Sequence, residues 1–214
     1  GIKISSKKQD TISFLKDNYG NTISGQIDKT LICKKNYYIL QANNLIKINR
    51  VSNTVSQISI KPGNQIRIND IGTDNNTVWI GTENSGLFSL SDASGKINHV
   101  LDFKKIEKLH IDNDCISLYG DSQIGIYEKN NKKFKVLRIF KSSNASIPEH
   151  NEITDIAKER NHVWIATKNG LYCLNTDNYQ IALYKAKTNG LSHNSISVLH
   201  VDKNNNLLIG TANG

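Results

Sequence analysis

A short phrase recurs along the chain at intervals of 38 to 47 residues. The stretch HVWIATKNGLYCLN at 162–175 closely repeats TVWIGTENSGLFSL at 77–90, and three weaker copies occur elsewhere. With the central apolar residue of each copy as its anchor, successive anchors lie 41, 38, 47 and 44 residues apart. The five anchors are Ile39, Ile80, Leu118, Ile165 and Ile209. A repeat of about 40–47 residues indicates either an array of helices or the blades of a β-propeller.

The pattern of apolar residues favours strands over helices. Apolar residues come in short runs rich in Val, Ile, Trp and Tyr, broken by Asn, Lys and Gly, and no eleven-residue stretch keeps an apolar face at helical spacing. Polar turns with sequences ERN, KNG and NTD separate the runs around Trp164. In this repeat we therefore expect four strands, at 152–158, 162–167, 170–175 and 178–186.

A four-stranded blade cannot bury both of its faces alone, so blades stack around an axis. We expect residues 1–214 to form an all-β fold, a β-propeller of about five four-stranded repeats. A closed five-bladed ring and a portion of a larger propeller are both compatible with the repeats, and we favour the portion. The repeat cores are expected at 36–48, 76–90, 114–127, 161–174 and 206–214.

Four residues of the two strongest repeats are expected to be structural. Trp79 and Trp164 lie in the middle of second strands, so their indoles should be largely buried between adjacent blades rather than stacked on a ligand. Gly86 and Gly170 follow the turns TENS and TKN, where a positive φ or a close backbone approach favours glycine.

Composition limits the class of protein. The chain has 37% hydrophobic and 21% charged residues, as expected for a folded domain, and no window approaches eighteen consecutive apolar residues. It begins without Met or an apolar leader, so we expect a piece of a longer protein. The three cysteines, Cys33, Cys115 and Cys173, lie in apolar stretches without a C-x-x-C pair, which favours buried free thiols over a disulfide framework or a zinc site.

The string TNGLSHNSISVLHVDKNNNLLIGTANG at 188–214 resembles the two-component regulator propeller repeat, in which a G-L-S-x-N-x-I segment precedes an acidic turn and a W-I-G-T-x-x-G-L stretch. The copies anchored at Ile80, Ile165 and Ile209 match well. The copy at Leu118 departs from the pattern, and the copy at Ile39 has lost its glycines. The resemblance implies seven-bladed propellers that form the periplasmic sensor of membrane-anchored hybrid histidine kinases, which detect products of glycan breakdown.

The chain offers little sign of catalytic or metal chemistry. None of its six histidines has the spacing of an H-E-x-x-H motif, and Ser and His near each other in LSHNSIS lack a nucleophile elbow. Carboxylate pairs such as Glu149 with Glu152, or Asp70 with Glu83, are better explained as solvated turn residues. We expect no catalytic residue, no metal site and no cofactor in this segment.

An asparagine recurs two residues before the first apolar residue of four repeats. The four are Asn21, Asn64, Asn151 and Asn194, and the Leu118 repeat has Lys104 there. With the first strand innermost, these side chains would ring the mouth of the central channel. Their amides can bond backbone groups that would otherwise be unpaired, or they can contact a ligand. The candidate ligand-binding residues are Asn64, Arg67, Asn151, Lys168, His193 and Asn194, with His150 beside them.

The net charge of +8 favours an anionic partner, although a solvated basic surface explains it equally well. Basic residues are scattered through every repeat without a nucleic-acid-binding motif, so we expect no nucleic acid. We therefore expect a non-catalytic periplasmic sensor that recognises an oligosaccharide, with an acidic one favoured, and that signals to a histidine kinase. The alternatives are a propeller enzyme, such as a polysaccharide lyase or glycosidase, and a protein-binding scaffold. A homodimer is left open.

Overall fold

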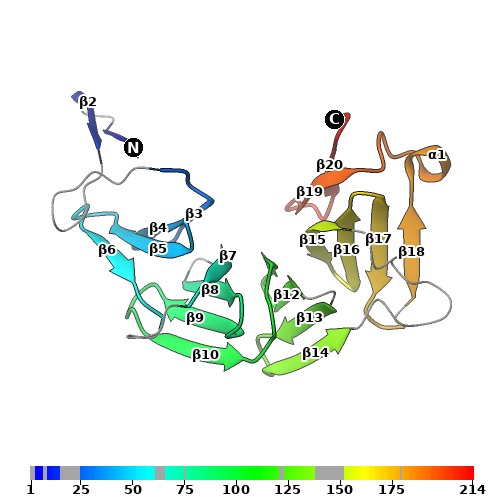
Figure 1. Ribbon diagram of the computed structural model, residues 1–214, viewed down its shortest axis with the longest axis horizontal. Helices are drawn as coiled ribbons and strands as arrows, with labels where there is room; N and C mark the ends of the chain where they lie inside the picture. The colour runs from blue at the N-terminus through cyan, green and yellow to red at the C-terminus, as the bar shows by residue number, and fades with distance from the viewer. Residues whose placement is uncertain are drawn as a thin grey trace. The chain divides into compact units, whose positions relative to one another are not determined.

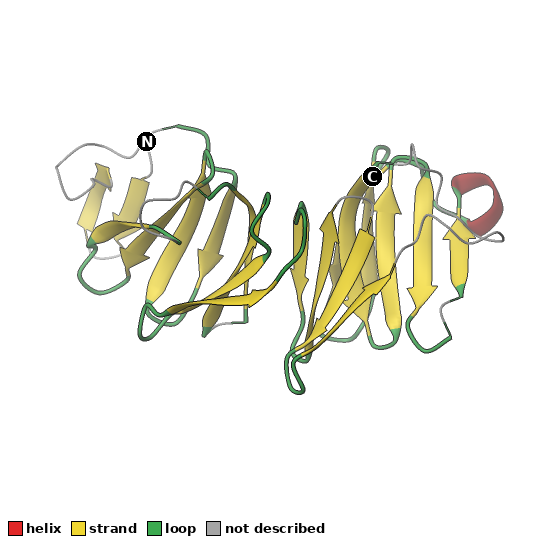
Figure 2. Ribbon diagram, turned by 60° about the horizontal axis from the view of Figure 1, so that its bottom comes forward, coloured by secondary structure: helices red, strands yellow, loops and turns green. Residues whose placement is uncertain are grey.

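The computed structural model describes residues 3–6, 9–14, 25–60, 66–74, 76–120, 123–137, 152–178 and 180–214. These residues form four four-stranded antiparallel sheets and two two-stranded pairs, with the strands of each sheet side by side in chain order (Figures 1 and 2). The all-β prediction is confirmed. The chain divides into two compact units, residues 1–106 and residues 107–214.

The described residues of unit 1 form ten strands, arranged as one two-stranded pair and two four-stranded sheets. The pair is β1 (Lys3–Ser6) and β2 (Gln9–Phe14), and the sheets are β3 (Lys29–Ile32), β4 (Asn36–Gln41), β5 (Asn44–Asn49) and β6 (Val55–Ile58), then β7 (Ile68–Thr73), β8 (Thr77–Thr82), β9 (Leu87–Ser91) and β10 (Ile97–Leu101).

The described residues of unit 2 form two four-stranded sheets, a final pair and one short helix. The sheets are β11 (Lys108–Ile111), β12 (Cys115–Gly120), β13 (Gln123–Glu128) and β14 (Lys133–Leu137), then β15 (Ile153–Glu159), β16 (His162–Thr167), β17 (Gly170–Asn175) and β18 (Ile181–Tyr184); α1 (Ala186–Asn189) precedes β19 (Ile196–Val201) and β20 (Leu207–Thr211). Within the described residues, no helix is long and apolar enough to span a membrane.

The repeat prediction locates the strands correctly. All five anchor residues lie on the second strand of their sheet or pair, including Leu118 of the divergent repeat. In the repeat of Trp164 the first three strands match to within one residue. The fourth strand is shorter than expected, because the chain turns into α1 at Ala186 and leaves the helix at Gly190, whose φ is 77°.

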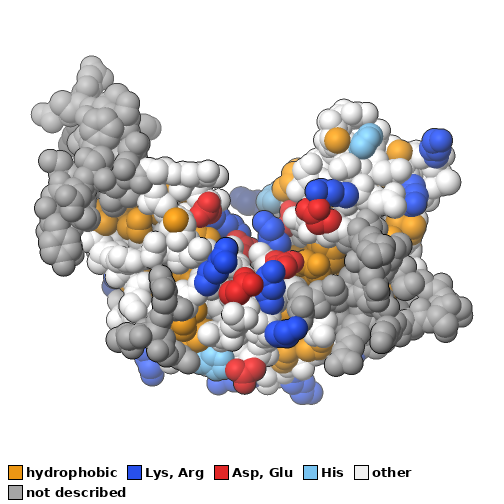
Figure 3. All heavy atoms as spheres, in the orientation of Figure 1, with side chains coloured by type: hydrophobic (Ala, Val, Ile, Leu, Met, Phe, Trp, Pro, Cys, Tyr) orange, Lys and Arg blue, Asp and Glu red, His pale blue; other side chains and the backbone are white. Residues whose placement is uncertain are grey.

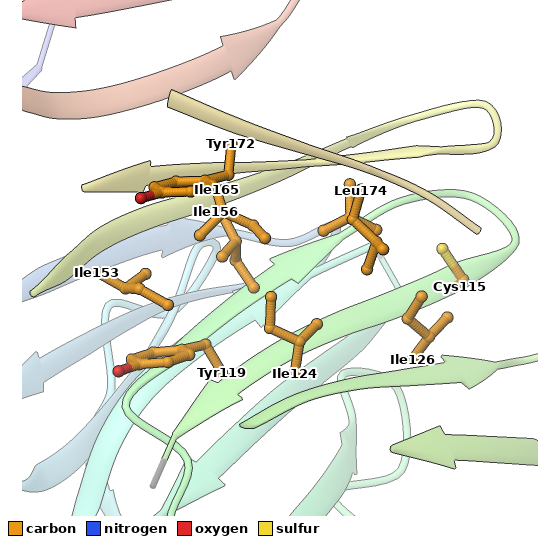
Figure 4. Close-up of a cluster of buried hydrophobic side chains, with 10 residues drawn as sticks. Cys115, Tyr119, Ile124, Ile126, Ile153, Ile156, Ile165, Tyr172 and Leu174 are labelled. Carbon is orange, nitrogen blue, oxygen red and sulfur yellow. The ribbon is translucent and has the colours of Figure 1, made fainter. Parts of the chain in front are cut away.

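Hydrophobic cores form where neighbouring sheets of a unit face each other. In unit 1, Tyr38 and Leu45 of one sheet belong to the same buried cluster as Ile80 and Phe88 of the next. In unit 2, Ile124 and Ile126 of β13 pack with Ile156 and Ile165 of the following sheet (Figure 4). Burial of apolar side chains between adjacent sheets is the dominant favourable contribution to the stability of a propeller blade.

Side chains of first strands also bond to neighbouring sheets. Asp155 accepts hydrogen bonds from its neighbour Ile156 N (2.9 Å) and, across the sheets, from Leu199 N (2.8 Å). The equivalent Asp70 of unit 1 accepts from Ile71 N (2.9 Å) and pairs with Lys29 Nζ of the preceding sheet (2.7 Å). An aspartate two residues into the first strand therefore connects one sheet to the next.

The two tryptophans differ in burial. Trp79 is 8% exposed, and its indole Nε1 donates to Asp74 Oδ2 at 3.1 Å. Trp164 lies at the equivalent place on β16 and packs against the core shared with β19 and β20, but it is only half-buried. Glu159 occupies the position equivalent to Asp74, and the buried Trp164 N–H has no hydrogen-bond partner among the described residues. The prediction of a largely buried indole is confirmed for Trp79 and holds only in part for Trp164.

Both predicted turn glycines have positive φ, +76° at Gly86 and +130° at Gly170. A Cβ on Gly86 would lie 2.1 Å from the main-chain oxygen of Leu101, and one on Gly170 would lie 3.0 Å from that of Tyr184. Positive φ and a close backbone approach therefore coincide at both positions, as the sequence predicts.

Candidate functional site

Those expected ligand-binding residues that the structure describes lie at one end of their sheets, which we call the proximal end. It is the end at which the first strand of each sheet begins and at which the second strand turns into the third. Lys168 lies in the turn between β16 and β17, while His193 and Asn194 precede β19. Arg67 precedes β7 in the other unit. Asn64, Asn151 and His150 lie outside the described residues.

Lys168 forms an ion pair at the proximal end of unit 2. Its Nζ lies 2.6 Å from Glu152 Oε2, with 58% and 64% of the two side chains exposed, and its backbone N donates to Glu152 O at 3.1 Å. Exposed pairs of this kind stabilise a fold by only about 0.2–1 kcal/mol. The functional consequence is larger, because Glu152 balances the positive charge that Lys168 would otherwise offer to an anionic ligand.

Asn194 uses its side chain to hold backbone groups. Its Oδ1 accepts a hydrogen bond from Ala186 N at 2.8 Å, and its main-chain oxygen accepts one from Gly170 N at 2.8 Å. The asparagine therefore fixes the start of α1 and the start of β17. This agrees with the structural explanation of the recurring asparagine and leaves the Nδ2 group for other contacts.

His193 is half-buried, and its Nδ1 accepts a hydrogen bond from Ser195 N at 3.0 Å. An imidazole nitrogen that accepts a hydrogen bond carries no proton, so the neutral ring has its proton on Nε2. The remaining function of this side chain is therefore that of a hydrogen-bond donor, suited to hydroxyl or carboxylate oxygens.

The strand register corrects the predicted alignment of the asparagines. Ile68, Ile153 and Ile196 pair with Thr82, Thr167 and Thr211, and each of these first strands has a bulge immediately afterwards. The residue two positions before Ile68 is Ile66, so Asn64 is not equivalent to Asn151 and Asn194. The prediction of a common asparagine position is wrong for Asn64, since its repeat has two more residues before the strand. The shared motif I-x-D-I, INDI at 68–71 and ITDI at 153–156, is the signal that gives the correct register.

One backbone hydrogen bond recurs at the proximal end of three repeats. The main-chain oxygen of the residue before the first strand accepts from the residue after the second strand, at 3.0 to 3.1 Å. The pairs are Arg67 with Glu83, Glu152 with Lys168, and Ser195 with Ala212. In the first pair the basic residue precedes the first strand and the acidic residue follows the second strand, whereas in the second pair this order is reversed.

Arg67 differs from Lys168 in its surroundings. Its side chain is exposed, and its guanidinium makes no hydrogen bond or ion pair with any residue that the structure describes. The facing Glu83 carboxylate instead accepts from Asn69 Nδ2 at 2.6 Å and lies 3.7 Å from Lys105 Nζ. Of the predicted residues that are described, Arg67 is therefore the best placed to bind an anion, since a guanidinium can pair with a carboxylate through two parallel hydrogen bonds.

A hollow of about 520 Å³ lies at the proximal end of the sheet β3–β6. Its polar side chains are mostly carboxamides, from the segment before β3, the turn between β4 and β5, and strand β6. The lining residues are Gly25, Gln26, Asp28, Gln41, Ala42, Asn44, Ile46 and Gln57. The sequence analysis missed this hollow, because its repeat has lost the glycine motif and the carboxamides between Gln26 and Gln57 have no fixed spacing.

Internal hydrogen bonds orient part of this lining. Gln57 Nε2 donates to Asn44 Oδ1 at 2.8 Å, and Asp28 Oδ2 accepts from Ala42 N at 2.9 Å. Carboxamides both donate and accept hydrogen bonds, as hydroxyl groups do. A hollow lined in this way suits a ligand rich in hydroxyls.

None of the three described carboxylates considered for catalysis is free of structural contacts, and Glu152 forms the ion pair with Lys168. Asp70 lies on β7, is 4% exposed and bonds to Lys29 and Ile71, so the expectation of a solvated turn residue is wrong for it. Glu83 bonds to Asn69. Glu149 lies outside the described residues. In the described part of the chain, no group of three or more His, Cys, Asp or Glu side chains could hold a metal ion. On the face drawn in Figure 3, basic and acidic side chains are interspersed.

The sheets and their register define a protein built of β-propeller repeats. Residues 190–213 match the family model described as Two component regulator propeller, which agrees with the resemblance of this repeat. No curated protein sequence matches the chain.

Solved structures confirm the propeller fold. The extracellular domain of BT4673 from B. thetaiotaomicron, described as a hybrid two component system, is 18% identical with a TM-score of 0.67, over 91% of this chain and 27% of that one. The extracellular domain of BT3049 from the same organism, described likewise, is 16% identical with a TM-score of 0.60, over 95% and 35%. The propeller domain of Cps50 (Swd1) from Myceliophteria thermophila is 10% identical with a TM-score of 0.63, over 88% and 63%. The chain thus spans about a quarter to a third of the length of the two B. thetaiotaomicron domains.

Proposed function

We propose that this chain is part of the extracytoplasmic sensor of a two-component signalling protein and that it binds an oligosaccharide without cleaving it. The observation that carries the proposal is the two component regulator repeat at 190–213, in a chain whose fold is similar to extracellular domains of hybrid two component systems. The parent protein would be a membrane-anchored histidine kinase, with this segment in the periplasm.

The proximal end supplies the chemistry for oligosaccharide binding. In unit 1, the carboxamide-lined hollow offers donors and acceptors to hydroxyl groups. In the same unit, Arg67 offers an uncompensated guanidinium to a carboxylate or sulfate. Unit 2, taken by itself, offers the His193 donor at its own proximal end, whereas its Lys168 is balanced by Glu152. Acidic sugars would therefore gain their extra affinity from Arg67 rather than from the net charge of the chain.

Titration calorimetry with neutral and acidic oligosaccharides of equal size tests this proposal. We expect acidic oligosaccharides to bind more tightly, and Arg67→Ala to remove most of that preference while affinity for neutral ones stays unchanged. The Lys168→Ala variant is the matched control, because it removes one exposed positive charge that already has a partner. Rising salt should weaken the Arg67 contribution, since the Debye length is roughly 8 Å at physiological ionic strength.

Three results would contradict the proposal. Cleavage products that disappear on replacement of one carboxylate would establish the enzyme alternative. Binding of another polypeptide, with no oligosaccharide binding, would establish the scaffold alternative. Equal affinity of Arg67→Ala and the unaltered chain for acidic oligosaccharides would return the basic residues to a solvated surface.

A further inference from the structure

A second concave site lies at the opposite, distal end of unit 2, where first strands end and third strands turn into fourth strands. It is a groove of about 410 Å³ between the sheets β11–β14 and β15–β18. Small-molecule sites have volumes of roughly 300–1,000 Å³. Both sheets beside the groove have all four strands, so the groove belongs to a complete junction between two blades.

Three carboxylates of the groove are each paired with an asparagine side chain. Asn161 Nδ2 donates to Asp177 Oδ2 at 2.6 Å, and Asn131 Nδ2 donates to Glu128 Oε2. Asn130 Nδ2 lies 3.5 Å from Asp114 Oδ1, at the long limit of a hydrogen bond. Each pair uses one carboxylate oxygen and leaves the second oxygen as an acceptor. The amide oxygens of Asn130 and Asn161 remain as acceptors too, whereas that of Asn131 already accepts from Lys133 N at 2.9 Å.

Two lysines supply donors to the same groove. Lys158 lies near the end of β15, and its Nζ donates to Arg160 O at 2.6 Å, which leaves further protons on the ammonium group. Lys135 of β14 lines the groove from the other sheet. Three carboxylates and two ammonium groups leave one net negative charge in the lining, so the groove has no strong preference for an ion of either sign.

The floor of the groove is apolar. Cys115 and Ile126 are 3% and 8% exposed, and Figure 4 shows them together at one end of the core cluster, away from Ile153 and Tyr119. Burial raises the pKa of the Cys115 thiol, and the charge of the nearby Lys158 only partly opposes this effect. The thiol therefore stays neutral at physiological pH, and the floor presents uncharged surface below a ring of polar groups.

We propose that this groove binds a neutral polyhydroxylated small molecule, of the size of one or two sugar units. Hydroxyl groups donate to the oriented carboxylate and amide oxygens and accept from the ammonium groups, and the apolar floor receives the C–H face of a sugar ring. The near balance of charge is what distinguishes this site from one for acidic sugars. This proposal does not depend on the proposed function of the proximal end.

Nuclear magnetic resonance titration of the chain with maltose, cellobiose, glucuronic acid and spermidine tests this assignment. The backbone amides of the β13–β14, β15–β16 and β17–β18 turns should shift with a neutral disaccharide. Asn161→Ala, which frees the Asp177 carboxylate from its partner, should weaken that binding roughly tenfold. Asn113→Ala is the matched control, because Asn113 lies in the β11–β12 turn beside Asp114 but does not line the groove.

Glu128→Gln gives a second test that keeps the side-chain shape and removes a charge. This variant should weaken disaccharide binding severalfold. It is the variant to use if Asn161→Ala unfolds at a lower temperature than the unaltered chain. Arg67→Ala should leave the turn shifts unchanged, so failure at one end of the sheets is distinguishable from failure at the other. The proposal is overturned if neutral disaccharides shift none of these turns at high millimolar concentration, or if glucuronic acid or spermidine binds there more tightly.

Discussion

Replacing Gly86 with alanine should destabilise unit 1 much more than the same change at Gly95. Both glycines have positive φ, +76° and +71°, so alanine should cost about 1–2 kcal/mol at either position. A Cβ at Gly95 would meet nothing within 4 Å. At Gly86 it would lie 2.1 Å from Leu101 O, where β10 ends against β9.

The close approach at Gly86 adds a second cost. A methyl group forced against main-chain atoms displaces them, and overpacking of this kind costs about 1–3 kcal/mol. Alanine also restricts the unfolded chain, but equally at both positions, so this effect cancels in the comparison. We expect Gly86→Ala to lower the free energy of unfolding by about 1–3 kcal/mol more than Gly95→Ala.

Urea unfolding followed by Trp79 fluorescence measures this difference, because Trp79 lies on β8 of the same sheet. A Trp164→Phe background removes the signal of the other unit. Equal destabilisation by the two alanines would refute the argument, since it would mean that β10 yields to the methyl group without loss of packing.

Three further substitutions test two hydrogen bonds described above and the burial of the Cys173 thiol, which is 7% exposed. Asp74→Ala removes the acceptor of the buried Trp79 N–H and should lower the free energy of unfolding by about 1 kcal/mol in the same urea assay. Asp155→Ala removes the acceptor of Leu199 N, so amide exchange at Leu199 should quicken more than in the sheet centres. Burial raises the pKa of the Cys173 thiol from 9.0 to about 11, so the unfolded chain loses this proton first. Stability should therefore fall as pH rises from 9 to 11, by up to about 2 kcal/mol, and a Cys173→Ala variant should lack that part of the decline.

Strand positions followed from the sequence because alternating burial leaves its period in the residues themselves. Ile165 and Tyr172 could be placed on adjacent strands from apolar runs and polar turns alone. The length of the segment before a first strand leaves no such period, so the sequence aligns Asn64 with Asn194 although the register separates them by two positions. Helix α1 has only four residues, too few for a periodic apolar face.

The candidate sites were harder to predict than the fold, because their properties depend on partners distant in sequence. The sequence alone suggests that Lys168 is a free cation, whereas in the structure it forms an ion pair with Glu152. The sequence pattern makes Trp164 equivalent to Trp79, but its repeat has Glu159 in place of Asp74. Its indole N–H therefore lacks the hydrogen bond that Trp79 makes. The carboxylate and amide pairs of the distal groove join residues up to 16 positions apart on different turns.

The recurring backbone hydrogen bond at the proximal end stabilises each repeat through main-chain atoms alone, whereas the side chains at the same positions differ from repeat to repeat. Arg67 with Glu83, Glu152 with Lys168, and Ser195 with Ala212 make the same main-chain contact with basic, acidic and neutral side chains in exchanged order. Because the bond needs only N–H and C=O groups, the side chains at these six positions can differ between repeats while the bond itself is kept. Under the proposed function, the ligand preference of one blade could therefore change by single substitutions on a constant backbone, without alteration of its neighbours.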